Sequence, residues 1–489
     1  MHSSSTPSAP TAALDAGLAA RFIDSLWDRH IVAELSEYIR IPAKSPAFDA
    51  QWAANGFIDA AVRHVTRWIE AQAVSGLRLD IVRLPGRTPL LFFEIAATRA
   101  ASTQTVLMYG HLDKQPESTG WRADLGPWTP KYENGRLYGR GSADDGYAPY
   151  AAIAAVLALQ QQNVPHPRIV GLIETSEESG SPDLLPYLDA LRDRLGDVAL
   201  AVCLDSGAGD YERLWLTTSL RGMASGTLKV QVLEAGVHSG DASGLVPSSF
   251  RVLRHVLDRL EDSATGRLLP AELHCRIPLE RVAQAEQSAA ILGDALLQNY
   301  PWTRYERDGQ PQRVQPMSAS GAEALLNPWR PSLSVIAAEG FPAPQDAGNV
   351  LRPYTAVRLS LRLPPPVDAT HALQAVKHLL ERDAPYQARV SFECHGGANG
   401  WNAPEATPWY ARAIDAASQQ CFGAPCAYLG QGGSIPLMRQ LQERFTAAQM
   451  MICGVLGPHS NAHGPNEFLH VPYAKRLTAA VATVVAAAP

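Results

Sequence analysis

Short hydrophobic runs alternate with helical patterns through the first 215 residues. Residues 90–96, 105–109, 168–173 and 198–204 are nearly uninterrupted apolar runs, which are typical of strands buried on both faces. Helical spacing of apolar positions predicts helices over residues 18–39, 148–162 and 183–195. Alternation of buried strands and helices predicts an α/β domain, with a mainly parallel mixed sheet flanked by helices.

The pattern changes after about residue 215. Residues 226–233, 356–363 and 388–393 look like strands, and residues 248–260 and 371–382 look like amphipathic helices. This order predicts a small α+β module with its helices on one face of a sheet. The polar, Pro-rich region between its parts gives no clear pattern. We therefore expect three segments: a first catalytic part over 1–215, an inserted α+β domain over 216–398, and a second catalytic part over 399–489.

Composition and charge narrow the function classes. The chain has 489 residues, 46% of them hydrophobic and 18% charged, so it should fold into about two to four globular domains. A net charge of −6 without a basic block argues against nucleic acid or an anionic membrane as the main partner. The longest nearly apolar stretch, 477–488, is shorter than the roughly 20 residues of a membrane span. Residues 1–14 lack the pattern of a secretory signal, so we expect a cytoplasmic protein.

Cysteines are sparse, and no CxxC pair suggests a thiolate metal site. The simplest interpretation is six buried free thiols in a reducing compartment. They are Cys203, Cys275, Cys394, Cys421, Cys426 and Cys453. Any metal would then need His, Asp and Glu ligands.

Acidic residues and histidines follow the predicted strands. His111 and Asp113 follow the strand 105–109, and Asp205 follows the strand 198–204. The other candidates are Glu174, Glu177, Glu178, Asp144, Asp145, His459, His463 and Glu467. Because ligands gather at the carboxyl ends of strands in open α/β sheets, we expect several of these groups to share one rim. Grouped carboxylates repel one another unless a cation offsets their charge, so the pattern favours a two-metal hydrolase site.

Five segments carry a specific resemblance. They are YGHLDKQP, GRLYGRGSADDG, IETSEESGS, CLDSG and NAHGPNEF, in this order along the chain. Together they resemble the signature of the co-catalytic zinc peptidases of metallopeptidase family twenty, which includes carnosinases and other dipeptidases, aminoacylases, glutamate carboxypeptidases and succinyl-diaminopimelate desuccinylases. The resemblance runs from about residue 85 to the end and is greatest to the carnosinase-like branch.

The resemblance implies a set of metal ligands. His111 and Asp205 would hold one ion, Glu178 and His463 the other, and Asp144 would bridge them, with a cis peptide bond after Asp144. It also implies two divalent ions per subunit, with zinc expected and manganese or cobalt as alternatives.

The resemblance also assigns two further acids. Glu177 would be the general base, and Asp113 would orient the imidazole of His111.

The inserted segment resembles the lid, or dimerisation, domain of that branch. His238 would stabilise the developing oxyanion in the partner subunit's site, with Asn349 beside it. Arg362 and His395 resemble residues that grip a substrate's free carboxylate. Gly433 and Ser434, in GQGGSIP, resemble the loop that completes this pocket. The resemblance therefore implies a homodimer that acts on small peptides.

Alternatives remain open at several positions. His459 competes with His463 for one ligand role, and Glu174 could be only structural. Relatives commonly have Asp-Asp-Lys-Gly where this chain has Gly146 and Tyr147 after the acid pair, and many have Glu where it has Gln431. These departures touch no expected ligand but could alter substrate preference.

The function that this pattern predicts is dipeptide hydrolysis. An N-acyl amino acid deacylase or carboxypeptidase with the same metal site is the nearest alternative, because only the substrate pocket would differ. An inactive binding homologue is a more distant one, since all the expected ligands and the base are present.

Overall fold

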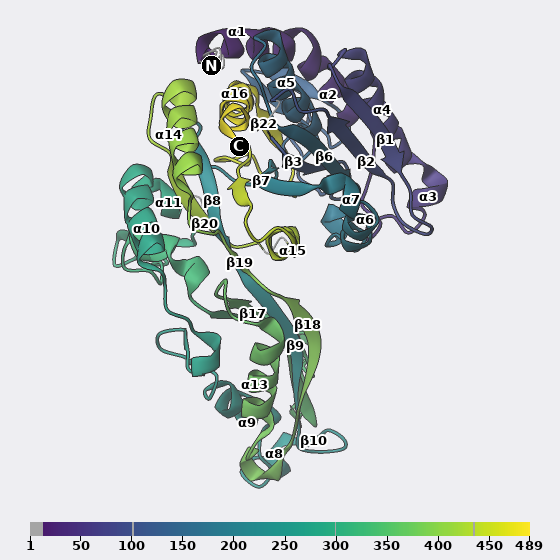
Figure 1. Cartoon of the computed structure of the whole chain (residues 1–489). Coiled ribbons are helices and arrows are strands. Elements are labelled where there is room, and N and C mark those ends of the chain that lie inside the picture. The colour runs from purple at the N-terminus through teal and green to yellow at the C-terminus, as the bar shows by residue number, and fades with distance from the viewer. Residues whose placement is uncertain (1–12, 100–101, 299, 434–435) are drawn as a thin grey trace, which may run out of the picture. The chain divides into compact units, whose positions relative to one another are not determined.

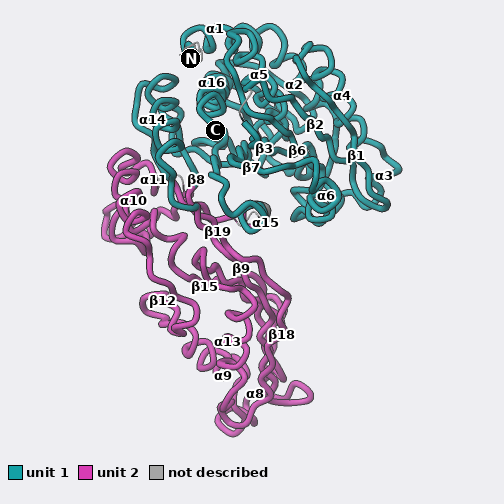
Figure 2. The backbone as a smooth tube through the Cα atoms, viewed as in Figure 1, with its two compact units in different colours: residues 1–217, 404–428, 440–489 teal, residues 218–403, 429–439 magenta. Residues whose placement is uncertain are grey.

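The computed structural model describes residues 13–99, 102–298, 300–433 and 436–489. Ser434, which was expected in the loop that completes the substrate pocket, lies outside these ranges. Residues 1–12 of the expected leader also lie outside them. The chain forms two compact units (Figure 2). Unit 1 consists of residues 1–217, 404–428 and 440–489, and unit 2 of residues 218–403 and 429–439. The segment 429–439, expected with the second catalytic part, thus belongs to unit 2.

Unit 1 is built on a six-stranded sheet in the order β1-β2-β6-β3-β7-β21 (Figure 1). Its strands are β1 (Leu77–Val82), β2 (Leu90–Ile95), β3 (Gln104–His111), β6 (Arg168–Glu174), β7 (Asp197–Cys203) and β21 (Gln449–Ile452). Neighbours from β6 to β21 pair in parallel, whereas β2 pairs antiparallel with both β1 and β6. The predicted mixed, mainly parallel sheet is confirmed. The four predicted buried strands are β2, β3, β6 and β7.

Helices flank this sheet. They are α1 (Ala16–Leu26), a π-helical turn (Trp27–Ile31), α2 (Val32–Ile39), α3 (Trp52–Asn55), α4 (Phe57–Ala71), α5 (Ala148–Gln161), α6 (Leu184–Ala190), α7 (Arg192–Leu195), α14 (Pro408–Phe422) and α16 (Val471–Ala487). Helix α5 packs on β3 and β6 and is buried along most of its length, while α16 packs on α5 and α14. The single helix expected over 183–195 is instead two short helices, α6 and α7.

A small antiparallel sheet lies beside the site described below. Strand β5 (Arg136–Tyr138) pairs with β4 (Lys131–Glu133) and with β22 (Phe468–His470). In the β5–β22 register Tyr138 faces Phe468, and the two rings pack with centroids 5.5 Å apart. The pairing brings the segment before α5 next to the segment before α16.

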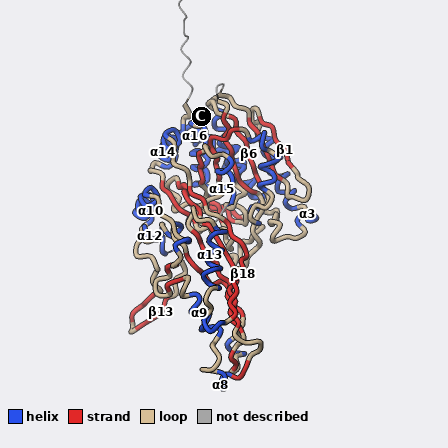
Figure 3. The backbone as a smooth tube through the Cα atoms, turned by 60° about the horizontal axis from the view of Figure 1, so that its bottom comes forward, coloured by secondary structure: helices blue, strands red, loops and turns tan. Residues whose placement is uncertain are grey.

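Unit 2 contains a four-stranded antiparallel sheet in the order β15-β17-β9-β18. Its strands are β9 (Gly222–Gln231), β15 (Ser332–Glu339), β17 (Tyr354–Leu363) and β18 (Arg389–Ala398). Helices α9 (Ser249–Leu257) and α13 (Ala369–Glu381) pack on it (Figure 3), and Leu228, Val256 and Leu359 are among the buried residues of this core. The predicted α+β arrangement is present, with β15 as an additional edge strand.

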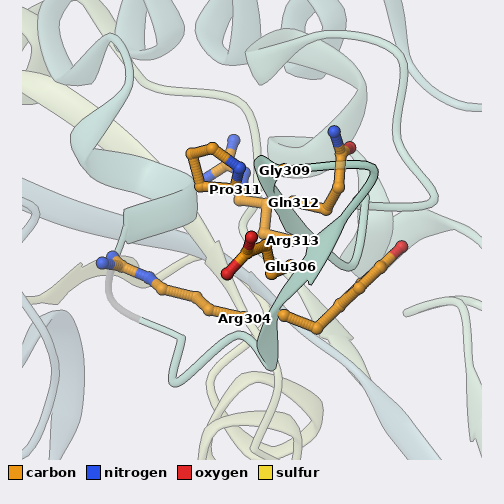
Figure 4. A pocket seen from close by; sticks show the side chains of 7 residues that line it. Arg304, Glu306, Gly309, Pro311, Gln312 and Arg313 are labelled. Atoms are coloured by element: carbon orange, nitrogen blue, oxygen red, sulfur yellow. The ribbon is translucent and has the colours of Figure 1, made fainter.

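The region that gave no clear pattern contains further elements. Besides β15 it holds α10 (Leu279–Leu292), α11 (Ala295–Gln298), α12 (Gly321–Leu325) and the hairpin of β13 (Arg304–Arg307) and β14 (Gln310–Arg313). All residues of the two hairpin strands are exposed, and Arg304, Glu306 and Gln312 border an open hollow there (Figure 4).

Two composition-based expectations can be compared with the structure. All six cysteines are free, but only Cys203, Cys426 and Cys453 are buried. Cys394 is exposed because it lies on the sheet-edge strand β18, so the expectation of six buried thiols is wrong. Within the described ranges, none of the helices combines the length and apolarity that crossing a membrane requires.

Candidate metal centre

The five predicted ligands come together in unit 1 as two groups that share Asp144. The first group is His111, Asp144 and Asp205, and the second is Asp144, Glu178 and His463. Within each group, one ligand atom of every residue lies within 4.8 Å of the others. Imidazole and carboxylate form a donor set suited to zinc and to other divalent transition metals.

The two carboxylate oxygens of Asp144 face different histidines. Oδ1 lies 3.2 Å from His111 Nε2, and Oδ2 lies 3.0 Å from His463 Nε2. Asp205 Oδ2 is 3.7 Å from His111 Nε2, and Glu178 Oε2 is 3.3 Å from His463 Nε2. A carboxylate with one oxygen directed at each group can bridge two ions.

Each ligand is positioned by the end of a strand or by a tight turn. His111 ends β3, Asp205 follows β7 by two residues, and Glu178 lies in a 3-10 turn after β6. These three strands run parallel, so their carboxyl ends lie at one edge of the sheet. Asp144 comes from a glycine-rich turn before α5, and its peptide bond to Asp145 is cis, as the resemblance implies.

Asp113 connects His111 to the acidic turn. Its backbone carbonyl is 3.1 Å from His111 Nδ1, and its carboxylate is 3.5 Å from the same nitrogen. Because a carbonyl oxygen only accepts, Nδ1 carries a proton, and Nε2 is the nitrogen that can act as a ligand once a metal ion replaces its own proton. The carboxylate also accepts hydrogen bonds from the amides of Glu177 (3.1 Å) and Glu178 (3.0 Å). One side chain therefore fixes both a ligand ring and the turn that carries Glu177.

Burial of so many acids perturbs their titration. Burial raises the pKa of Asp205 to about 7 and also raises the pKa values of Glu177 and Glu178. Hydrogen bonds with Asp144 and Glu178 raise the pKa of His463 to about 11. In the protein without bound metal, protons therefore offset the negative charge of the grouped acids. Divalent cations can replace these protons, so the residues present fit a metal centre.

Asp144 shows the opposite shift. Burial by itself raises the pKa of this carboxyl, but hydrogen bonds with His111 and His463 outweigh burial and bring the pKa below its usual value. The shared carboxylate is therefore charged at neutral pH, as a bridging ligand must be.

Glu177 is beside both groups but belongs to neither. Its Oε2 lies 4.0 Å from His111 Nε2, and burial raises its pKa well above the usual value of a glutamate. Glu177 therefore lies next to the ligands without belonging to either ligand group.

Geometry separates the alternatives that the sequence left open. His459 is exposed and is in neither ligand group, whereas His463 is in the second. The carboxylate of Glu174 accepts hydrogen bonds from the hydroxyls of Tyr109 (2.6 Å) and Ser181 (2.9 Å), which is a structural role.

Three further residues contact the site: Gln115 and Arg140 were not singled out from the sequence, and Glu467 was a candidate acid without an assigned role. Gln115 donates to Glu178 Oε2 at 2.6 Å. Arg140 and Glu467 form a fully buried ion pair at 2.7 Å, next to the turn that carries Asp144. All three lie within or next to the quoted motifs, but only their contacts distinguish them from neighbouring polar residues.

The departure at Gly146 and Tyr147 has a packing reason. A Cβ atom at position 146 would lie 2.1 Å from the ring of Tyr38 and 2.5 Å from the carbonyl oxygen of Gly141. The hydroxyl of the buried Tyr147 donates to the carbonyl of Leu204. The ring of Tyr38 therefore occupies the space that any side chain at position 146 would need.

The remaining predicted residues lie in unit 2. His238, on β10 (Val237–His238), is exposed, and the amide of Ser239 donates to the carbonyl of Asn349 at 2.9 Å. His238 and Asn349 are therefore neighbours across a short strand pair with β16 (Val350–Leu351).

Arg362 lies beside the glycine-rich loop. Its Nη1 donates to the carbonyl of Gly432 at 3.3 Å, next to Gly433. His395 Nε2 is 2.7 Å from the hydroxyl of Thr227, and strand β9 separates its strand from that of Arg362. Arg221, which was given no role, is buried near Arg362, and burial together with that charge lowers its pKa to about 10.

Known proteins are similar to this chain over most of its length. The model of peptidase family M20/M25/M40 matches residues 107–487. The cysteinylglycine-S-conjugate dipeptidase of Corynebacterium striatum is 28% identical over 84% of this chain and 88% of that protein. The human Beta-Ala-His dipeptidase is 26% identical over 97% of this chain and 93% of that protein.

Solved structures have the same fold. The di-peptidase Dug1p from Saccharomyces cerevisiae has a TM-score of 0.72 at 21% identity, covering 97% of this chain and 99% of that chain. Human carnosine dipeptidase 1 has a TM-score of 0.68 at 22% identity, covering 97% of this chain and all of that chain. Because the family model matches more than three quarters of the chain, the protein belongs to peptidase family M20/M25/M40.

Proposed function

We propose that this protein is a metal-dependent dipeptidase that cleaves an amide bond next to a small free carboxylate. The observation that carries the proposal is the geometry of Asp144, whose two oxygens face His111 and His463 separately. The dipeptidase names of the relatives from Corynebacterium striatum and human support the substrate class.

Two divalent ions per subunit, zinc or alternatively manganese or cobalt, would complete the site. His111 and Asp205 would hold one ion, Glu178 and His463 the other, and Asp144 both. Such ions polarise an amide carbonyl and lower the pKa of bound water. The raised pKa values of Asp205 and Glu178 support this assignment, because two cations offset the charge that burial penalises.

Glu177 would move the proton in the reaction. Its carboxylate accepts a proton from the attacking water and then passes it to the leaving amine. Asp113 supports this role because its carboxylate accepts hydrogen bonds from the amides of Glu177 and Glu178 and so fixes the backbone of the turn that carries both side chains.

Residues of unit 2 would bind the substrate. Arg362, His395 and the loop with Gly433 and Ser434 would hold the free carboxylate. His238, with Asn349 beside it, would stabilise the oxyanion in the partner subunit's site. The contact of Arg362 with Gly432 supports a joint role of strand β17 and this loop.

We also propose that unit 2 serves as the lid and dimerisation domain and that the protein is a cytoplasmic homodimer. Strand β15 is an unpaired sheet edge among the described residues, and Val335 and Ile336 on it are 52% and 58% exposed. An exposed apolar edge favours pairing with another chain. The free cysteines agree with a reducing compartment.

A substrate and metal panel tests the proposal. We expect the metal-loaded protein to hydrolyse dipeptides faster than N-acetyl amino acids, and chelation to abolish hydrolysis until zinc, manganese or cobalt is restored. Glu177→Gln should lower kcat by about 10²–10⁴-fold while both metal equivalents stay bound. Glu174→Gln, which removes a nearby acid outside the ligand groups, is the matched control and should keep activity.

The alternatives have distinct results. Faster hydrolysis of N-acetyl amino acids than of dipeptides would identify a deacylase. Metal binding without hydrolysis of either class would indicate an inactive binding homologue.

A further inference from the structure

Arg140 and Glu467 form a buried ion pair next to the turn that carries Asp144. Arg140 Nη1 donates to Glu467 Oε2 at 2.7 Å, and the two side chains are 1% and 0% exposed. Neither residue is in a ligand group. Two buried charges are costly and are often replaceable by apolar side chains, so the contacts of this pair need an explanation beyond stability.

Glu467 holds the turn that carries Asp144. Its Oε1 lies 3.0, 3.3 and 3.4 Å from the amide nitrogens of Gly141, Ala143 and Asp144. Its own backbone carbonyl accepts from the amide of Gly139 at 3.0 Å. The carboxylate therefore sits in a cradle of backbone donors that ends at the shared ligand.

Arg140 contacts the loop that carries His463 and the segment that follows His111. Nη2 donates to the carbonyl of Gly464, next to His463, at 2.9 Å, and Nε donates to the carbonyl of Pro116 at 3.2 Å. Nη2 also lies 3.3 Å from the hydroxyl of Ser118, which itself donates to the carbonyl of His463 at 3.1 Å. The rigid fork of a guanidinium can satisfy several acceptors at fixed directions, which a lysine cannot do.

His463 needs such support from its surroundings. Its side chain is 56% exposed, and its backbone has a positive φ of 62° in a loop. The Arg140–Glu467 pair joins this loop both to the turn before Asp144 and to the segment after His111. Pairing of β5 with β22 supports the same connection from outside the site.

We propose that Arg140 and Glu467 are positioning residues that set the distance between His463 and Asp144 and so determine the affinity of the second metal position. This inference rests on the proposed two-metal function. The pair touches no ligand side chain and acts through the backbone on either side of the ligands.

Metal binding measures this role directly. Bound zinc per chain is determined over a series of chelator-buffered free zinc concentrations, for the full-length wild type and for Arg140→Lys. His463→Ala serves as the reference, because it removes a ligand of the second position. We expect Arg140→Lys to weaken the second equivalent by about 10–100-fold, as is common for residues behind metal ligands, and to leave the first nearly unchanged.

A second variant guards against misfolding. The double substitution Arg140→Met with Glu467→Leu removes both charges together, so no unpaired charge stays buried. We expect it to give a wild-type circular dichroism spectrum but to lose the second equivalent, as His463→Ala does. Arg168→Lys alters another arginine–glutamate pair, Arg168 with Glu94 at 2.6 Å, at the opposite end of β6 and should bind two equivalents normally.

The outcomes are separable. Wild-type affinity for both equivalents in Arg140→Lys or in the folded double variant would overturn the positioning role while leaving the proposed function intact. Fewer than two equivalents in the wild type would instead contradict the proposed function, and the positioning role with it.

Discussion

Glu174 is a buried carboxyl in unit 1 that accepts hydrogen bonds from neutral hydroxyl groups. Burial raises its pKa from 4.5 to about 7, although the hydroxyls of Tyr109 and Ser181 donate to it. The folded protein therefore keeps a proton that the unfolded chain releases above pH 4.5. Its stabilising contribution is complete below that pH and is lost as the pH rises towards 7.

This shift predicts a pH-dependent difference between the wild type and Glu174→Gln. The free energy of unfolding of the wild type should fall relative to that of the variant between pH 5 and pH 8. A rise from 4.5 to about 7 corresponds to at most about 3 kcal/mol. Urea unfolding of both metal-free proteins at four pH values measures the difference, and a constant difference would contradict the expectation.

At the residue scale, the sequence could indicate which side chains carry chemistry but not all of their contacts. His111 and Asp205 were predictable because each follows a buried strand within a recognisable motif, and Asp144 because it lies in the glycine-rich motif before a predicted helix. The choice of His463 over His459 depended on resemblance, since both are histidines of the same loop. Arg140 and Glu467 could not be given roles, because their importance arises from contacts between segments more than 300 residues apart.

At the scale of single elements, strands β6 and β2 pack closely where Gly171 faces Phe93. The two residues are partners in the antiparallel β2–β6 register. A Cβ atom at position 171 would lie 2.0 Å from two ring carbons of Phe93. The ring thus occupies the space that any side chain at position 171 would need.

Gly171→Ala should therefore destabilise unit 1 by roughly 1–3 kcal/mol, the usual cost of overfilling a packed core. Adding Phe93→Leu should recover part of this loss, because the smaller side chain vacates the contested space. Denaturant unfolding of the two single variants and the double variant gives the coupling energy. Additive effects of the two substitutions would show that the Phe93 ring does not occupy the space that a side chain at position 171 needs.

Buried elements could be predicted from the sequence more readily than exposed ones. Strands β2, β3, β6 and β7 were predictable because burial on both faces requires long apolar runs. Strand β15 was not, because six of its eight positions are exposed and no alternation marks it. A continuous helix was expected over residues 183–195, but the backbone is interrupted at Leu191. The interruption could not be predicted because the apolar side chain of Leu191 keeps the helical spacing.

At the scale of the whole molecule, metal removal should affect the two units differently. All the expected ligands belong to unit 1 and come from well-separated parts of its chain. Chelation should therefore speed amide hydrogen exchange in the segments around His111, Asp144, Glu178 and His463. Exchange in the sheet of unit 2 should stay the same and acts as the internal control. Mass spectrometry of peptic fragments measures both, and a uniform change across the units would contradict a centre confined to unit 1.

The position of unit 2 within the sequence has a consequence for biosynthesis. Strand β21, which completes the sheet beside β7, and the loop of His463 both follow unit 2 along the chain. A ribosome has therefore made the whole sheet of unit 2 before the last ligand emerges. Chains that end before His463 lack one residue of the second ligand group and therefore cannot assemble both groups. The proposed hydrolysis is therefore expected only of chains whose synthesis has passed His463.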